Sequence, residues 1–173
     1  MKKLLCCLLL FASSCNLKEQ DKSNATAYFD LAAYFKKEAA RLTKLDLTFN
    51  KSVLVNGTKE EKKVKISNWK KEFDTFSSSD INKASWRGSF KLNKTEGEEI
   101  YTSANDKIPV KKLQISYQND KIKAIRIYIA NSNDLYTSKD TLTYYPDSLY
   151  QINKTQQVKL MDQKKYIITG RFK

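Results

Sequence analysis

The chain has 173 residues, a formal net charge of +13 at pH 7 and no histidine. Without histidine it can form neither a Ser-His-Asp triad nor a zinc or iron site with imidazole ligands. Hydrophobic residues make up 40% of the sequence and aromatic residues 12%, which is typical of a globular domain and not of a disordered chain. The length suits one domain with a core of its own.

The N-terminal segment has the layout of a secretory signal peptide. Lys2 and Lys3 precede an apolar run from Leu4 to Ala12, and small residues then lead to Cys15. The run is far shorter than the roughly 20 residues that cross a bilayer as a helix. A cysteine at this position resembles the lipobox of bacterial lipoproteins, in which the thiol is acylated, palmitate included, and becomes the first mature residue. The resemblance implies that Cys15 is lipidated and anchors the chain to a membrane.

We therefore expect a signal peptide at residues 1–14, a lipidated cysteine and tether at 15–24, and a single domain at 25–173. The tether is polar and has no periodic pattern. Asn16, and not aspartate, follows the cysteine. For a lipoprotein this favours the outer membrane over the inner one.

Cysteine chemistry is not expected in the mature domain. Cys6 and Cys7 leave with the signal peptide and Cys15 is used by lipid, so no thiol remains for a disulfide, a metal site or a nucleophile. Together with the lack of histidine, this predicts neither a metal nor a cofactor. Removal of Lys2 and Lys3 lowers the formal net charge by two, from +13 to +11.

Residues 25–43 have the periodicity of an amphipathic helix. Apolar side chains recur there at helical spacing, and Ser23 or Asn24 is placed to cap the helix start. The stripe comprises Tyr28, Leu31, Ala32, Phe35, Ala39 and Leu42.

Residues 68–77 predict a second helix. Trp69, Phe73 and Phe76 form its apolar stripe, and Asp80 is placed to cap a further short turn. The simplest interpretation is that the three rings pack in the core and that Asp80 is only a cap.

The sequence of this second helical segment also resembles that of known proteins. The stretch 69–76, followed by Asp-Ile-Asn-Lys at 80–83, resembles a block in small envelope lipoproteins of Gram-negative bacteria. The segment 135–144 is similar to the same group. The resemblance implies no activity.

The remainder alternates apolar and polar residues, as β-strands do. Candidate strands are 45–55, 63–66, 86–92, 99–104, 110–118, 121–130, 135–144, 149–153, 156–161 and 165–172. Turns are predicted at Asn56-Gly57, Asn119-Asp120 and Pro146-Asp147. We predict an α+β fold in which one or two helices pack on an antiparallel meander sheet of about six to eight strands. Such a sheet either stays open or curls into a half-barrel around the first helix.

Paired carboxylates are the catalytic groups of glycoside hydrolases. Glu96, Glu98 and Glu99 cluster in the sequence, with Asp74 and Asp80 upstream. The alternative is that these acids are merely solvated, and we expect no enzyme.

A group of tyrosines surrounds the Pro146 turn. An exposed ring could stack on a partner protein or a sugar, so Tyr136, Tyr144, Tyr145 and Tyr150 form a candidate partner surface. The alternative, which we favour, is that these rings fill a β core.

Lysines crowd at 59–71, 107–123 and 154–165. Behind a lipoprotein signal they would not meet nucleic acid, so anionic envelope lipids are the expected counter-charge. The alternative, which we favour, is a solvated sheet face with lysines at the outward positions. Two Asp-Ser/Thr-aliphatic sequences also mark Thr141 and Ser148 as candidate O-glycosylation sites.

These observations predict a non-enzymatic interaction module, tethered to a membrane of the cell envelope, with a protein partner that the sequence does not identify. The alternative is a carrier of a lipid or other apolar ligand, with the first helix lying on a curved sheet as in lipoprotein-localisation factors. A lysozyme inhibitor is disfavoured, because a chain at +11 would be repelled by a basic lysozyme.

Overall fold

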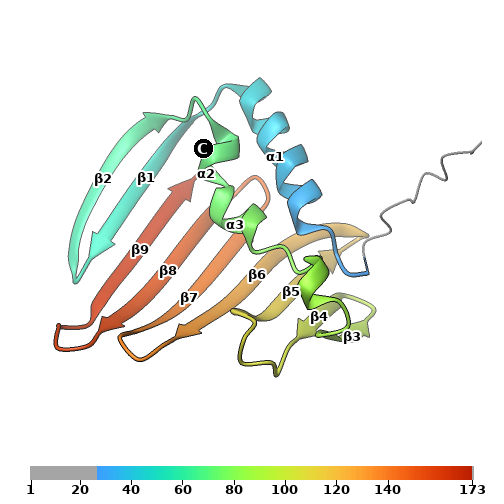
Figure 1. Ribbon diagram of the computed structural model, residues 1–173. Coiled ribbons are helices and arrows are strands. Elements are labelled where there is room, and N and C mark those ends of the chain that lie inside the picture. The colour runs from blue at the N-terminus through green and yellow to red at the C-terminus, as the bar shows by residue number, and fades with distance from the viewer. Residues whose placement is uncertain (1–26, 173) are drawn as a thin grey trace, which may run out of the picture.

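A nine-stranded antiparallel sheet forms the body of the protein in the computed structural model, which describes residues 27–172 (Figure 1). The strands are β1 (Thr48–Val55), β2 (Thr58–Lys65), β3 (Lys91–Thr95), β4 (Glu98–Thr102), β5 (Val110–Gln118), β6 (Lys121–Ser132), β7 (Tyr136–Tyr145), β8 (Leu149–Val158) and β9 (Lys164–Arg171). Their order across the sheet is β2-β1-β9-β8-β7-β6-β5-β4-β3. The edge strands β2 and β3 do not pair with each other, so the sheet is open.

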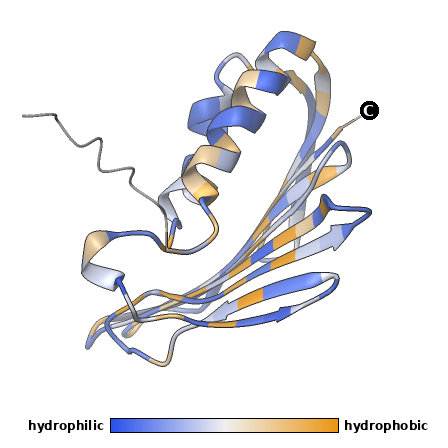
Figure 2. Ribbon diagram, turned by 90° about the vertical axis from the view of Figure 1, so that its right-hand side faces the viewer, coloured by the Kyte–Doolittle hydropathy of each residue, from blue (hydrophilic) through white to orange (hydrophobic). Residues whose placement is uncertain are grey.

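The helices lie on one face of this sheet (Figures 1 and 2). They are α1 (Leu31–Leu45), α2 (Trp69–Glu72), α3 (Asp74–Ser78) and the short 3₁₀ helix η1 (Ala84–Trp86). The predicted α+β class with helices on an antiparallel sheet is confirmed, whereas the predicted strand number is too low. We call the covered side the helix-bearing face and the opposite side the outer face.

The first helix has the predicted stripe but a later start. Leu31, Phe35 and Leu42 are completely buried against the sheet and the other helices. The cap is Asp30, whose carboxylate accepts a hydrogen bond from the Ala33 amide at 2.8 Å. Tyr28 precedes the helix, and the proposed caps Ser23 and Asn24 lie outside the described residues.

The second predicted helix is divided in two at Phe73, between α2 and α3. Asp80 does not cap a turn of its own, because its carboxylate accepts a hydrogen bond from the Leu31 amide at 3.3 Å. Asn82 accepts one from the Tyr28 amide at 3.0 Å. The segment after α3 therefore secures the start of α1.

The turn chemistry explains most of the strand pairing. Asn56 and Gly57 have φ of 48° and 94°, as a type I′ turn requires, and they join β1 to β2 as predicted. The predicted break between 153 and 156 is wrong. β8 runs through it because both of its neighbours continue to pair there.

An aromatic core fills the space between the helices and the sheet. Phe35 of α1 and Phe76 of α3 have ring centroids 4.9 Å apart, and the Phe73 ring lies 5.5 Å from Tyr144 of β7. Tyr150 of β8 is also completely buried. Edge-to-face contacts of this kind add to the burial of apolar area.

Register assigns the strand residues to the two faces, since successive side chains alternate. Strand residues in register with Tyr144 and Tyr150 belong to the helix-bearing face. The basic residues that register places on the outer face are Lys59, Lys63, Lys65, Lys91, Lys112, Arg126, Lys139, Lys165 and Arg171. The acidic strand residues of that face are Glu61 and Glu98.

Gly170 is the position where a larger side chain should be least tolerated. It pairs with Tyr150, and an added Cβ would lie 2.2 Å from Cε1 of that ring. We expect Gly170→Ala to lower the free energy of unfolding, measured in urea, by about 1–3 kcal/mol, because the buried ring cannot move away. Gly97→Ala is the matched control, since an added Cβ there would lie 3.8 Å from the Tyr117 carbonyl oxygen, an ordinary van der Waals contact. An equal loss in both variants would contradict this packing.

Candidate functional site

The helices leave part of the helix-bearing face uncovered, over the ends of β6 to β9 that lie farthest from them (Figure 1). The side chains there are half-buried and adjoin one another through the strand register. We call this surface the open floor; it comprises Val53, Ile129, Asp140, Ile152, Lys154 and Ile168. It is mainly apolar and contains one pair of opposite charges.

A groove of about 470 Å³ extends the open floor toward α2. Ile152 and Ile168 form its apolar base, and the side chains of Val64 and Ile66 line it as well. Lys51 and Glu72 also line it and form an ion pair with an Nζ–Oε1 distance of 2.6 Å. We call it the α2 groove.

Glu72 also fixes the position of α2. The buried Tyr150 hydroxyl donates a hydrogen bond to the same Glu72 oxygen that binds Lys51. Burial raises the pKa of Tyr150 above its usual value, and the hydrogen bond to Glu72 raises it further. The neutral phenol is therefore the form that the fold stabilises.

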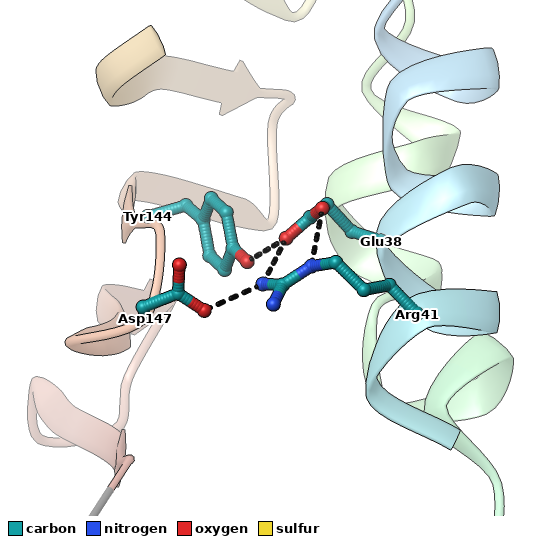
Figure 3. Close-up of polar contacts among 4 residues, drawn as sticks. All are labelled: Glu38, Arg41, Tyr144 and Asp147. Carbon is teal, nitrogen blue, oxygen red and sulfur yellow. Dashed lines mark hydrogen bonds and ion pairs between the residues drawn. The ribbon is translucent and has the colours of Figure 1, made fainter. Parts of the chain in front are cut away.

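A second tyrosine makes the same contact with α1 (Figure 3). The Tyr144 hydroxyl donates to Glu38 Oε2 at 2.5 Å, and Arg41 donates to both Glu38 oxygens at 3.0 and 2.9 Å. Arg41 also forms an ion pair of 2.8 Å with Asp147, in the turn between β7 and β8. Burial, followed by the contact with Glu38, raises the pKa of Tyr144. Since the Tyr144 ring is buried and both Glu38 oxygens are paired, this contact fixes α1 to the sheet.

Asp140 is the least satisfied polar group of the open floor. Its Oδ1 atom is buried and has no hydrogen-bond partner within residues 27–172. Its Oδ2 atom lies 3.6 Å from Lys154 Nζ. Burial raises the pKa of Asp140. Because the Oδ1 atom is covered by neighbouring atoms, the group of this pair that solvent and a partner can reach is the Lys154 ammonium, whose side chain is 37% exposed.

The acidic cluster is divided between the two faces of the sheet. Glu98 accepts a hydrogen bond from Gln114 at 2.6 Å on the outer face. Glu99, on the opposite face, accepts hydrogen bonds from Tyr101 at 3.0 Å and Tyr117 at 3.2 Å. The two adjacent glutamates therefore do not face each other across a common site.

Glu99 also borders a hollow of about 880 Å³, which Glu96 helps to line. Burial alone would raise the pKa of Glu99, but hydrogen bonds from Lys94, Tyr101 and Tyr117 outweigh burial and lower it. A carboxyl group with a lowered pKa is ionised at neutral pH and does not serve as a general acid. Asp80 is bound to the start of α1 instead.

The predicted tyrosine surface needs correction. Tyr144 and Tyr150 are completely buried, so they belong to the core and cannot contact a partner. Tyr136 and Tyr145 are half-buried and lie on opposite faces. Tyr145 accepts a hydrogen bond from Arg126 at 2.8 Å on the outer face.

The candidate O-glycosylation sites, Thr141 and Ser148, differ in exposure. Ser148 is exposed in the turn before β8, whereas Thr141 is half-buried within β7. Cys15 lies outside the described residues. Within residues 27–172, no group of three or more His, Cys, Asp or Glu residues could hold a metal ion, and no helix is long and apolar enough to span a membrane.

No protein-family model, curated protein or solved structure matches this chain.

Proposed function

We propose that this protein is a non-enzymatic interaction module, tethered by lipid on Cys15 to a membrane of the cell envelope, with the outer membrane favoured. Its partner-binding surface is the open floor together with the α2 groove. The observation that carries this proposal is that apolar side chains of the sheet are left half-buried beside a helix layer that is fixed in place.

The filled core supports a protein partner over a small apolar ligand. A carrier needs an enclosed cavity that covers most of its ligand. Here the rings of Phe35, Phe73 and Tyr144 occupy the space between helices and sheet. The open floor and α2 groove instead form a broad, accessible surface with an apolar centre and polar groups beside it, as protein interfaces have.

The open floor also has groups that would orient a partner. Lys154 lies beside Asp140 with its side chain 37% exposed, so a partner can reach its ammonium group. A partner that presents an apolar side chain to Ile152 and a carbonyl or carboxylate oxygen to Lys154 would contact both groups.

The lipid tether is tested by Cys15→Ala. In cells given an alkyne-labelled palmitate, the wild-type chain is expected to take up label and to sediment with membranes, and the variant to do neither. Cys6→Ala is the matched control and should remain labelled, because that residue leaves with the signal peptide. A variant without Cys15 that is still acylated would contradict the tether.

The partner surface is tested by cross-linking in living cells. A diazirine-bearing lysine analogue replaces Lys154 in the open floor or, as control, Lys44, which is exposed on α1. We expect irradiation to give a discrete protein adduct from position 154 and none from position 44. Adducts with lipid alone at position 154 would contradict the interaction module and support the carrier. The same adducts from both positions would contradict a specific surface.

A further inference from the structure

The outer face of the sheet is a second surface with a distinct chemistry. Within residues 27–172 no helix lies on it. Its centre is uncharged, and side-chain amides and hydroxyls are bonded to one another there. Asn153 donates to Gln151 and Gln151 donates to Thr169, each at 3.1 Å. These side chains bond to one another, so the centre of the outer face is polar but uncharged.

Positive charge surrounds this polar centre. Nine basic residues occupy outer-face strand positions, against the acids Glu61 and Glu98. Both acids are engaged locally, Glu61 with Lys59 at 2.7 Å and Glu98 with Gln114 at 2.6 Å. The face is therefore strongly basic.

The helix layer differs, because acids are interspersed with its lysines. Glu38 lies beside Arg41, and Glu72 and Asp74 follow Lys70 and Lys71. The helix-bearing side also carries basic residues, such as Lys36, Lys37 and Lys62, but acids accompany them more closely there than on the outer face. Basic residues therefore outnumber acids most strongly on the outer face.

We infer that the outer face docks on the anionic phospholipid headgroups of the membrane to which the protein is tethered. The inference rests on the proposed lipid anchor, and charge complementarity carries it. Each basic residue held near an anionic surface contributes about 1 kcal/mol, or roughly a fivefold change in the docking equilibrium. Basic residues on one open face can contribute together, whereas residues scattered over the molecule cannot.

This orientation agrees with the position of the proposed partner surface. Docked by its outer face, the domain presents the helix-bearing face, with the open floor and α2 groove, away from the membrane. The 13 steps of chain from Cys15 to Tyr28 can span at most roughly 47 Å, which exceeds the thickness of a helix layer on a sheet.

The orientation can be measured on the full lipidated chain in vesicles. Once Cys15 is acylated, a cysteine introduced by Thr137→Cys on the outer face, or by Ala40→Cys on α1, is the one free thiol for a dye. Both positions are exposed. Vesicles contain headgroup-quencher lipid and either phosphatidylglycerol or phosphatidylcholine alone. We expect strong quenching at 137 in anionic vesicles, several-fold less in neutral ones, and little at 40 in either.

Two charge variants test the face itself. Replacing Lys63, Lys139, Lys165 and Arg171 by glutamine is expected to reduce quenching at 137 in anionic vesicles to the level in neutral ones. Replacing Lys36, Lys37, Lys44 and Lys70 on the helix side by glutamine removes the same amount of charge. This second variant is expected to leave the quenching at 137 in anionic vesicles unchanged. Equal quenching in both kinds of vesicle, or equal effects of the two variants, would overturn the inference. A chain that fails to float with either kind of vesicle would instead refute the tether.

Discussion

Two tyrosine–carboxylate contacts hold the helix layer on the sheet. Tyr144 and Tyr150 are cross-strand partners on β7 and β8, and their hydroxyls donate to Glu38 of α1 and Glu72 of α2. A hydrogen bond to a charged group contributes about 1.5–3 kcal/mol, and each carboxylate is also paired with a cation. Neighbouring positions of the sheet thus fix two helices that are far apart in the sequence.

This attachment determines which surfaces remain available. Because α1 and α2 are fixed above the tyrosines, the open floor stays half-buried beside them, and no helix of residues 27–172 covers the outer face (Figure 2). The two surfaces differ in chemistry, since the floor is mainly apolar and the outer face is polar and basic. A protein with such faces can contact a membrane on one side and a partner on the other, which is the arrangement that we propose.

Periodicity and turn residues predicted most of the elements, since these signals are local. The stripe of α1 and the Asn56-Gly57 turn are examples. The contacts of Glu38 and Glu72 were missed, because they join residues 106 and 78 positions apart in the sequence, and no local pattern sets how the helices pack on the sheet. A usable signal existed for Glu72, an acid between the buried Trp69 and Phe76. The open floor could not be predicted either, since its residues come from strands whose order follows from the whole topology.

The pH dependence of stability in tyrosine variants tests this account most directly. Burial and the carboxylates raise the pKa of Tyr144 and Tyr150 above the unfolded value of about 10. Their contribution is therefore complete below pH of about 10 and is lost as the pH rises further. We predict that Tyr144→Phe and Tyr150→Phe each lower the free energy of unfolding, measured in urea, by about 1–3 kcal/mol at pH 7. The difference in this free energy between each variant and wild type should shrink above pH of about 10. A loss under about 0.5 kcal/mol, or a difference independent of pH, would contradict the claim that these contacts hold the helices on the sheet.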